Sequence, residues 1–207
     1  MIRRTLLLLS AALLVLGCAA PQAPSAQDAV MANILSRKSV RSYTDQPLSE
    51  EQITTMLKAA MAAPSGSNIQ PWSFVVLTDK SDYDTIFEGN FNMEKFKQSA
   101  AVIVLCADTT VTRTPRGGGE AVVMPNGTWR DDLGAATENL LLAAESMGLG
   151  AVWTASYPYK ERYMPVKKAL GLPAEVVPYA IVPVGYPAGD EQPKDKWKPE
   201  RIHYGRW

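Results

Sequence analysis

Three groups of polar side chains in this sequence have types and spacings that suit the binding of a small, partly anionic molecule. The first group comprises Arg37, Lys38, Ser39 and Arg41, and so places three cations and a hydroxyl within five residues. A guanidinium is a planar fork of donors and a serine hydroxyl is a short donor, so these residue types suit a phosphate. A basic helix end exposed to solvent would have the same composition, so the group on its own is a weak signal.

The second group lies in the segment 62–72, which reads AAPSGSNIQPW and contains Pro64, Ser65, Asn68 and Gln70. Asparagine and glutamine amides both donate and accept hydrogen bonds, so they match a heterocycle whose edge alternates N–H and C=O groups. A turn-rich linker before a strand would look the same. The third group comprises Lys194 and Lys196 near the C-terminus, which add positive charge for an anion but would also suit a solvated surface.

The overall composition excludes several other kinds of site. The chain has 207 residues, of which 46% are hydrophobic and 20% charged, which is enough for one globular domain with a core. Basic and acidic residues both number 21, so no broad basic field indicates a nucleic-acid partner. The single histidine, His203, argues against a histidine-based metal site or a Ser-His triad, and two cysteines cannot form a zinc cluster.

Interleaved helix and strand patterns predict an α+β or α/β domain without repeats or an internal linker. Helices are predicted over 27–36, from a capping box at 49–52 as far as Pro64, over 129–147 and over 158–170, with mixed short helices over 81–98. Strands are predicted over 72–77, 100–107, 151–155 and 176–184. Cys106 falls in the apolar strand 100–107 and is interpreted as structural filler rather than as a nucleophile.

The segment 108–128 is interpreted as a long loop or flap because it is rich in glycine and proline, including the run Gly117 to Gly119. It would be either a disordered surface loop or an element of specificity, with Met124 and Trp129 facing a flat ligand. The tail 188–207 ends in aromatic residues, which favours docking, on a partner subunit for example, over a frayed terminus.

The N-terminus has the pattern of an export signal. Arg3 and Arg4 precede a short apolar run that ends in Gly17 and Cys18, which predicts a signal peptide over 1–17 and resembles the bacterial lipobox, with Cys18 lipidated. An ordinary signal with an incidental cysteine is the alternative, and the arginine pair is consistent with either a twin-arginine or a plain basic leader. We expect a tether over 18–28, a domain over 29–207, and a lipid anchor at the bacterial cell envelope, facing the periplasm or the exterior.

Taken in order, the motifs resemble the nitroreductase-like flavoprotein family over residues 30–207. The matching segments are 37–43 (RKSVRSY), 62–72, 132–142 running into 148–153 (GLGAVW), and 184–187 (VGYP) with 193–196 (PKDK) and 202–207. The resemblance implies an α+β homodimer with a central, mostly antiparallel sheet flanked by helices, a C-terminal tail exchanged between subunits, and FMN bound at the subunit interface.

The resemblance also implies roles for individual residues. The phosphate, the ribityl chain and the pyrimidine side of FMN would contact Arg37 and Arg41, with Lys38 or Ser39, and the tail would add Lys194 and Lys196. Relatives often have arginine where Lys196 stands, and lysine lacks its bidentate fork. The other subunit would supply Pro64, Ser65, Asn68 and Gln70. The N5 edge of the flavin would lie near Thr154, Ala155 and Ser156.

Such a protein would pass hydride or electron pairs from a donor such as NAD(P)H to a nitroaromatic, quinone or similar acceptor. The flavin carries the redox chemistry, so no catalytic side chain is assigned. An envelope location conflicts with a cytoplasmic nicotinamide donor. The alternative hypothesis is therefore a non-catalytic flavin-binding lipoprotein that stores, senses or relays electrons.

Overall fold

The computed structural model describes residues 23–87 and 93–207, and its centre is an antiparallel sheet. The strand order is β1 (Trp72–Leu77), β2 (Ala101–Asp108), β7 (Val176–Gly185) and β5 (Gly150–Ala151), while β6 (Thr154–Ala155) also pairs with β7. Each of these pairs is antiparallel, and a β-bulge shifts the register of β2 against β7 between Leu105 and Cys106. The predicted α+β class with a mostly antiparallel sheet is confirmed.

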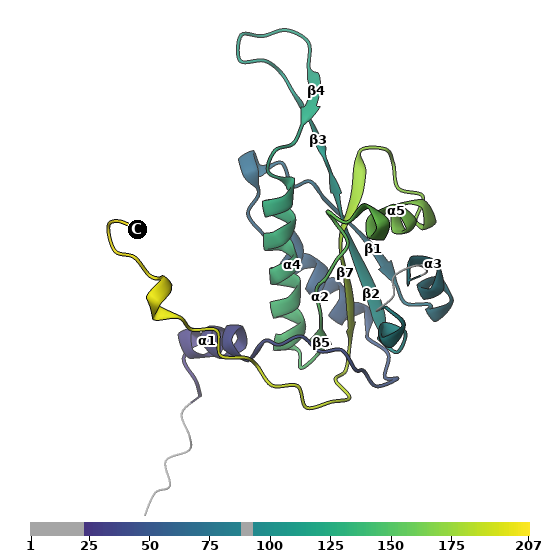
Figure 1. The fold of residues 1–207 in the computed structure, drawn as a ribbon, viewed down its shortest axis with the longest axis vertical. Coiled ribbons are helices and arrows are strands. Elements are labelled where there is room, and N and C mark those ends of the chain that lie inside the picture. Colours follow the sequence, from purple (N-terminus) through teal and green to yellow (C-terminus); the bar gives the residue numbers. More distant parts are fainter. Residues whose placement is uncertain (1–22, 88–92) are drawn as a thin grey trace, which may run out of the picture.

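Helices cover both faces of the sheet (Figure 1). Helices α2 (Glu50–Met61) and α4 (Trp129–Ser146) lie on one face, and α3 (Tyr83–Phe87) and α5 (Lys160–Ala169) lie on the other. Alternate residues of β2 enter the two cores, since Ile103 packs under α2 and α4 whereas Val104 packs on the opposite side. This double coverage explains why β2 reads as a continuous apolar run.

Local signals in the sequence define the ends of the main helices. Ser49 and Gln52 form the predicted capping box at the start of α2. Gly148 ends α4 with a φ of 69°, a conformation that favours glycine. Helix α1 (Ala26–Ser36) begins with a further capping box between Ser25 and Asp28. Short 3₁₀ helices occur at Gly66–Asn68, Lys80–Asp82, Glu94–Phe96 and Pro199–Arg201.

Of the long loop or flap predicted over 108–128, the loop is wrong, whereas a flap agrees with the structure. This segment is a two-stranded hairpin of β3 (Thr110–Arg113) and β4 (Val122–Pro125) that projects from the body of the fold (Figure 1). β-Branched residues, which favour strands, flank a turn in which Gly118 and Gly119 have positive φ. The sequence therefore contained the residue types of a β-hairpin, although its glycine content suggested a loop. The single strand predicted over 151–155 is in fact the two short strands β5 and β6.

Two apolar segments lie outside the packed layers. Helix α1 has no buried residue, and Val30 and Leu35 are 58% and 68% exposed. In the tail, Trp197 and Trp207 are 73% and 101% exposed, so the predicted docking does not take place on the tail's own chain. Figure 1 shows both segments beyond the sheet and its helices.

The predicted signal peptide, Cys18 and the first part of the tether lie outside the described residues. In the ranges that are described, the structure has no helix with the length and apolar character needed to cross a membrane.

Cys106 is 1% exposed within β2, and burial raises the pKa of its thiol to about 12. The thiol is therefore neutral at physiological pH, which agrees with a packing role rather than a nucleophilic one.

Gly150 provides a test of how tightly the sheet holds the segment that carries Ser39 and Arg41. A Cβ at Gly150 would lie 2.6 Å from the Cβ of Val40, which is fully buried. We expect Gly150→Ala to lower the free energy of unfolding by about 1–3 kcal/mol, measured by urea denaturation. Gly117→Ala is the matched control, because nothing lies within 4 Å of that position. Equal stabilities of the two variants would contradict this packing.

Candidate functional site

The structure brings the first and third predicted groups together in one cavity. The cavity has a volume of about 290 Å³. It is lined by Arg37, Lys38, Ser39 and Arg41 from the segment after α1 and by Glu191, Gln192, Lys194 and Lys196 from the tail. Residues from opposite ends of the domain thus concentrate positive charge at one place, and this place is hereafter called the cation cavity.

The segment 37–43 is fixed along the edge of the sheet. Ser39 forms a parallel bridge with Ala151 of β5, and the Val40 N–H donates to the Ala151 carbonyl oxygen at 3.1 Å. Val40 points into the core, so its neighbours Ser39 and Arg41 are directed outward, into the cavity. The buried Tyr43 hydroxyl lies 2.7 Å from the Val40 carbonyl oxygen, and burial raises its pKa far above the usual value, so it remains neutral.

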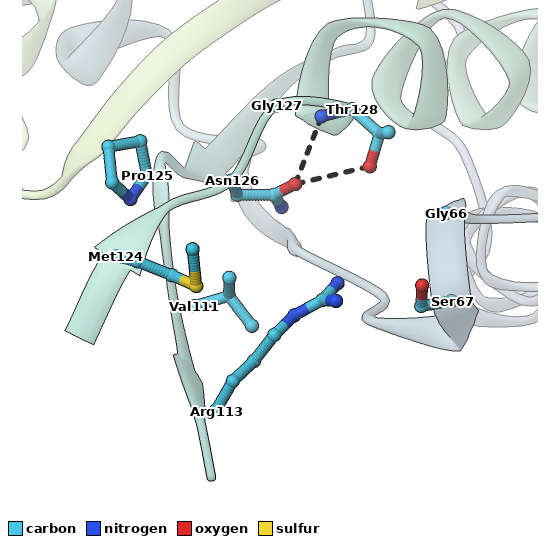
Figure 2. A pocket seen from close by; sticks show the side chains of 9 residues that line it. All are labelled: Gly66, Ser67, Val111, Arg113, Met124, Pro125, Asn126, Gly127 and Thr128. Carbon is cyan, nitrogen blue, oxygen red and sulfur yellow. Dashed lines mark hydrogen bonds between the residues drawn. The ribbon is translucent and has the colours of Figure 1, made fainter. Parts of the chain in front are cut away.

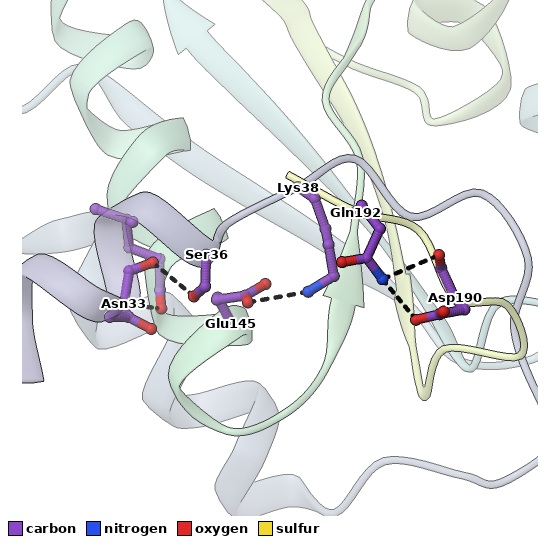
Figure 3. A network of polar contacts seen from close by, with 7 residues as sticks. Asn33, Ser36, Lys38, Glu145, Asp190 and Gln192 are labelled. Carbon is purple, nitrogen blue, oxygen red and sulfur yellow. Dashed lines mark hydrogen bonds and ion pairs between the residues drawn. The ribbon is translucent and has the colours of Figure 1, made fainter. Parts of the chain in front are cut away.

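Helix α4 holds two of the cations by ion pairs. Arg37 Nε lies 3.1 Å from Glu138 Oε1, and Lys38 Nζ lies 3.1 Å from Glu145 Oε1 (Figure 3). The guanidinium of Arg41 instead donates to the backbone oxygen of Ser39 at 3.2 Å. Within the described ranges, Arg41, Lys194 and Lys196 form no ion pair, so their charges remain available to a ligand.

The tail reaches the cavity from the end of β7. The Thr44 N–H donates to the Tyr186 carbonyl oxygen at 2.9 Å, and the Ala188 N–H donates to the Ser42 carbonyl oxygen at 3.1 Å. The Ser42 hydroxyl and the Arg41 N–H then donate to Glu191 Oε1 at 3.2 and 3.4 Å.

Glu191 and Gln192 were not among the predicted site residues. Burial acts to raise the pKa of Glu191, but hydrogen bonds from backbone N–H groups and the Ser42 hydroxyl, together with the charge of Lys38, outweigh it and lower the pKa below its usual value. Gln192 donates to the Asp190 carboxylate at 2.7 Å (Figure 3). Their position between Pro187 and Pro193, just before Lys194, is the sequence signal that could have found them.

The second predicted group forms a rigid loop elsewhere on the chain. The Gly66 N–H donates to Asp132 Oδ1 at 2.8 Å, and the Thr128 hydroxyl donates to Asp132 Oδ2 at 3.1 Å. A Cβ at Gly66 would lie 2.3 Å from Thr128 Oγ1, so only glycine allows this approach. Asp132, which is 4% exposed, therefore anchors the loop to the start of α4.

Three residues of the loop have an uncommon backbone conformation. Ser67, Asn68 and Gln70 all have positive φ values, 53°, 55° and 53°, which non-glycine residues adopt mainly where surrounding structure imposes it. The Gln70 amide donates to Asn68 Oδ1 at 2.8 Å, and the Gln70 N–H donates to Ser65 Oγ at 3.0 Å. Pro64, Asn68 and Gln70 are exposed, and none of the four predicted loop residues lines the cation cavity of its own chain.

A second cavity, of about 230 Å³, lies between this loop and the hairpin (Figure 2). Val111, Arg113 and Met124 line it from the hairpin, and Gly66 and Ser67 line it from the loop. Figure 2 shows the guanidinium of Arg113 directed into the space between the two. Met124 therefore lines a cavity, and its contact with a flat ligand stays a prediction.

Trp129 lines a different cavity, of about 470 Å³, although most of its side chain is buried. It is the first residue of α4 and is 5% exposed, and its ring packs edge-on against Tyr157 with centroids 4.8 Å apart. The side chain is thus mainly part of the core.

The segment 154–156 lies beside β7 and does not line the cation cavity. The Thr154 hydroxyl donates to the Ile181 carbonyl oxygen at 2.6 Å, and Ala155 pairs with Ala180. Ser156 is 1% exposed, and its hydroxyl has no hydrogen-bond partner among the described residues. An orphaned hydroxyl of this kind is uncommon in a folded protein.

No metal site is visible in the described part of the chain, where His, Cys, Asp and Glu residues form no group of three or more with suitable positions. His203 stacks on Trp207 in the exposed tail, with ring centroids 4.3 Å apart.

Comparison with known proteins agrees with this architecture. Residues 34–186 match the model of the "Nitroreductase family". A "Putative NADH dehydrogenase/NAD(P)H nitroreductase" of Archaeoglobus fulgidus is 37% identical over 177 residues, covering 84% of this chain and 96% of the relative. An "FMN reductase (NADPH)" of Bacillus subtilis is 27% identical over 178 residues, covering 83% of this chain and 71% of the relative.

A solved structure gives the same result in three dimensions. It is the crystal structure of a "Putative NADH dehydrogenase/NAD(P)H nitroreductase" from Bacteroides thetaiotaomicron. It superposes with a TM-score of 0.77 at 40% identity, covering 86% of this chain and 98% of that one. The sheet, its helices and the sequence match point to one conclusion: the chain belongs to the nitroreductase family.

Proposed function

We propose that this protein is an FMN-dependent oxidoreductase that takes reducing equivalents from a donor such as NAD(P)H and passes them to a nitroaromatic, quinone or similar acceptor. The cation cavity is the observation that carries the proposal. The names of the relatives, which include NAD(P)H nitroreductase and FMN reductase, support it.

The residues of the cation cavity fit the phosphate end of FMN. Five cations line the cavity, and three carboxylates either pair with them or line it, which leaves an excess of two positive charges. A phosphate monoester carries nearly two negative charges at neutral pH. Arg41 would supply the bidentate fork, Lys194 and Lys196 would supply point charges, and Ser39 would add a neutral donor.

The loop residues are best explained by a second subunit. Asn68 and Gln70 are exposed, have positive φ values, and do not line the cation cavity of their own chain. We therefore place Pro64, Ser65, Asn68 and Gln70 against the flavin bound by the partner in a homodimer. The exposed apolar residues of α1 and of the tail support an exchange of these segments between subunits, because such surfaces are rarely left in water.

The protein's part in the reaction is to bind and orient the cofactor. When bound, FMN supplies the redox chemistry by accepting a hydride and passing its reducing equivalents on. Arg41, Lys194 and Lys196 would fix the phosphate end, and thereby the position of the ring system. The orphaned hydroxyl of Ser156 is a polar atom inside the protein that lacks a partner, and it lies in the segment we assign to the N5 edge.

We further propose that Cys18 is lipidated and tethers the domain to the bacterial cell envelope. The apolar run before Gly17 and Cys18 supports this, and so does the short segment between Cys18 and the start of α1 at Ala26. A location outside the cytoplasm would restrict access to nicotinamide nucleotides, so a quinol is the second donor class to test.

Purification and stopped-flow kinetics test the function directly. We expect the purified protein to be yellow, to bleach on mixing with NADH, NADPH or a quinol, and to regain its colour on addition of a nitroaromatic or quinone. A yellow protein that no donor reduces would point to the non-catalytic flavin-binding lipoprotein instead. A colourless protein that takes up no added FMN in calorimetry would overturn the proposal.

Arg41→Ala tests the phosphate contact. The side chain forms no ion pair within the described ranges and packs in no core, so the fold should survive its loss. A lost charge-assisted hydrogen bond of about 1.5–3 kcal/mol predicts FMN binding weaker by about tenfold or more, measured by quenching of flavin fluorescence. Arg162→Ala, which removes an arginine of α5 outside the cavity, should bind as the wild type does. FMN affinity unchanged by Arg41→Ala would remove this role.

Cys18→Ser tests the anchor. The wild type should sediment with membranes, resist a salt wash and dissolve in detergent, because several buried acyl chains hold a protein durably. The variant keeps a residue of similar size but cannot be lipidated, and it should appear in the soluble fraction. Identical fractionation of the two proteins would contradict lipidation.

A further inference from the structure

We propose that Glu191 is a positioning residue that fixes the tail against residues 41–42, so that Lys194 and Lys196 reach the cation cavity. The inference rests on the proposed function only in taking the phosphate of FMN as the ligand. Glu191 itself need not touch that phosphate.

The side chain of Glu191 joins the tail to residues 41–42 by hydrogen bonds. Its Oε1 atom accepts hydrogen bonds from the Ser42 hydroxyl and the Arg41 N–H at 3.2 and 3.4 Å. Its Oε2 atom is enclosed and has no hydrogen-bond partner among the residues that the structure describes. A Cβ on Gly189 would lie 3.0 Å from both Glu191 Oε2 and Ser42 Oγ, so the turn closes tightly over the carboxylate.

Ala188, whose N–H donates to the Ser42 carbonyl oxygen at 3.1 Å, is the first tail residue held by the domain, and beyond it the described residues make few polar contacts with the tail. Across residues 23–87 and 93–207, the two hydrogen bonds of Glu191 are the only ones that join 189–207 to the rest of the domain. The segment 191–198 has no regular secondary structure, and the tail forms no ion pair with the described residues. Within one subunit, Glu191 is therefore the last described residue whose hydrogen bonds join the tail to the domain before the two lysines.

The negative charge of Glu191 argues against direct binding of the phosphate by this residue. A carboxylate beside a bound phosphate repels it, so removal of the charge alone should tighten binding slightly. Removal of the hydrogen-bond acceptor should free the tail and weaken binding. These opposite effects allow the positioning role to be separated from electrostatics with two substitutions at one residue.

The experiment compares Glu191→Gln, which keeps an acceptor oxygen without the charge, with Glu191→Ala, which removes both. FMN dissociation constants are measured on the apoprotein by fluorescence quenching. We expect Glu191→Ala to weaken binding by about tenfold, the loss expected for charged contacts to a phosphate, and Glu191→Gln to bind at least as tightly as the wild type. Asp190→Ala is the matched control. It removes a neighbouring carboxylate that accepts only from the Gln192 amide, and it should bind as the wild type does.

A double-mutant cycle tests whether Glu191 affects FMN binding through Lys194 and Lys196. If Glu191 acts through the lysines, Glu191→Ala should cause no further loss in a chain that already carries Lys194→Met and Lys196→Met. A full, additive loss in that background would overturn the inference. Tighter FMN binding by both Glu191 variants would also overturn it, because only electrostatic repulsion would then remain.

Trypsin cleavage after Lys196 provides a readout that does not need FMN. A freed tail should be cut faster in Glu191→Ala than in the wild type or Glu191→Gln, because cleavage requires the chain to detach locally. Equal cleavage and equal FMN affinity would overturn the role of Glu191 and leave the proposed function intact. Failure of the wild type to bind FMN would overturn the proposed function, and the cleavage rates would still decide whether Glu191 holds the tail.

Discussion

Repulsion among five cations in one cavity is the constraint that shapes this molecule. Such a concentration of like charge is unfavourable unless carboxylates offset part of it or an anion binds. Helix α4 supplies Glu138 and Glu145 to Arg37 and Lys38, and the tail supplies Glu191 beside Arg41. The compensation is incomplete, and the remaining positive charge is the reason why we propose a phosphate as the ligand of the cavity.

Helix α4 connects the separate parts of the site. Its first turn contains Asp132, which anchors the strained loop through Gly66, and its later turns contain Glu138 and Glu145. The opposite face of the helix packs on the sheet through Leu133 and Leu140. One rigid, core-packed element therefore sets the position of the loop and of the cationic segment together, which is how a binding site of this kind keeps its geometry.

Much of this arrangement was predictable from sequence because it follows from short-range patterns. The boundaries of α2 and β1 follow from a capping box and an apolar run, and the family match confirms the likeness found in the ordered motifs. The hairpin at 110–125 was missed because glycine and proline content outweighed the valines that pair across it. Glu191 was missed because its partner, Ser42, lies at the other end of the domain.

The sequence by itself determined which residues carry charge, where helices begin, and which strand is covered on both faces, since these depend on side-chain type and on periodicity of a few residues. Only the tertiary structure decided that Arg37 and Lys38 are paired while Arg41 is not, and that the tail lysines join them in one cavity. The physical reason is that ion pairing and cavity shape depend on contacts between residues far apart in the chain. Contacts between distant residues produce no repeating local pattern, so they cannot be recognised in a single sequence.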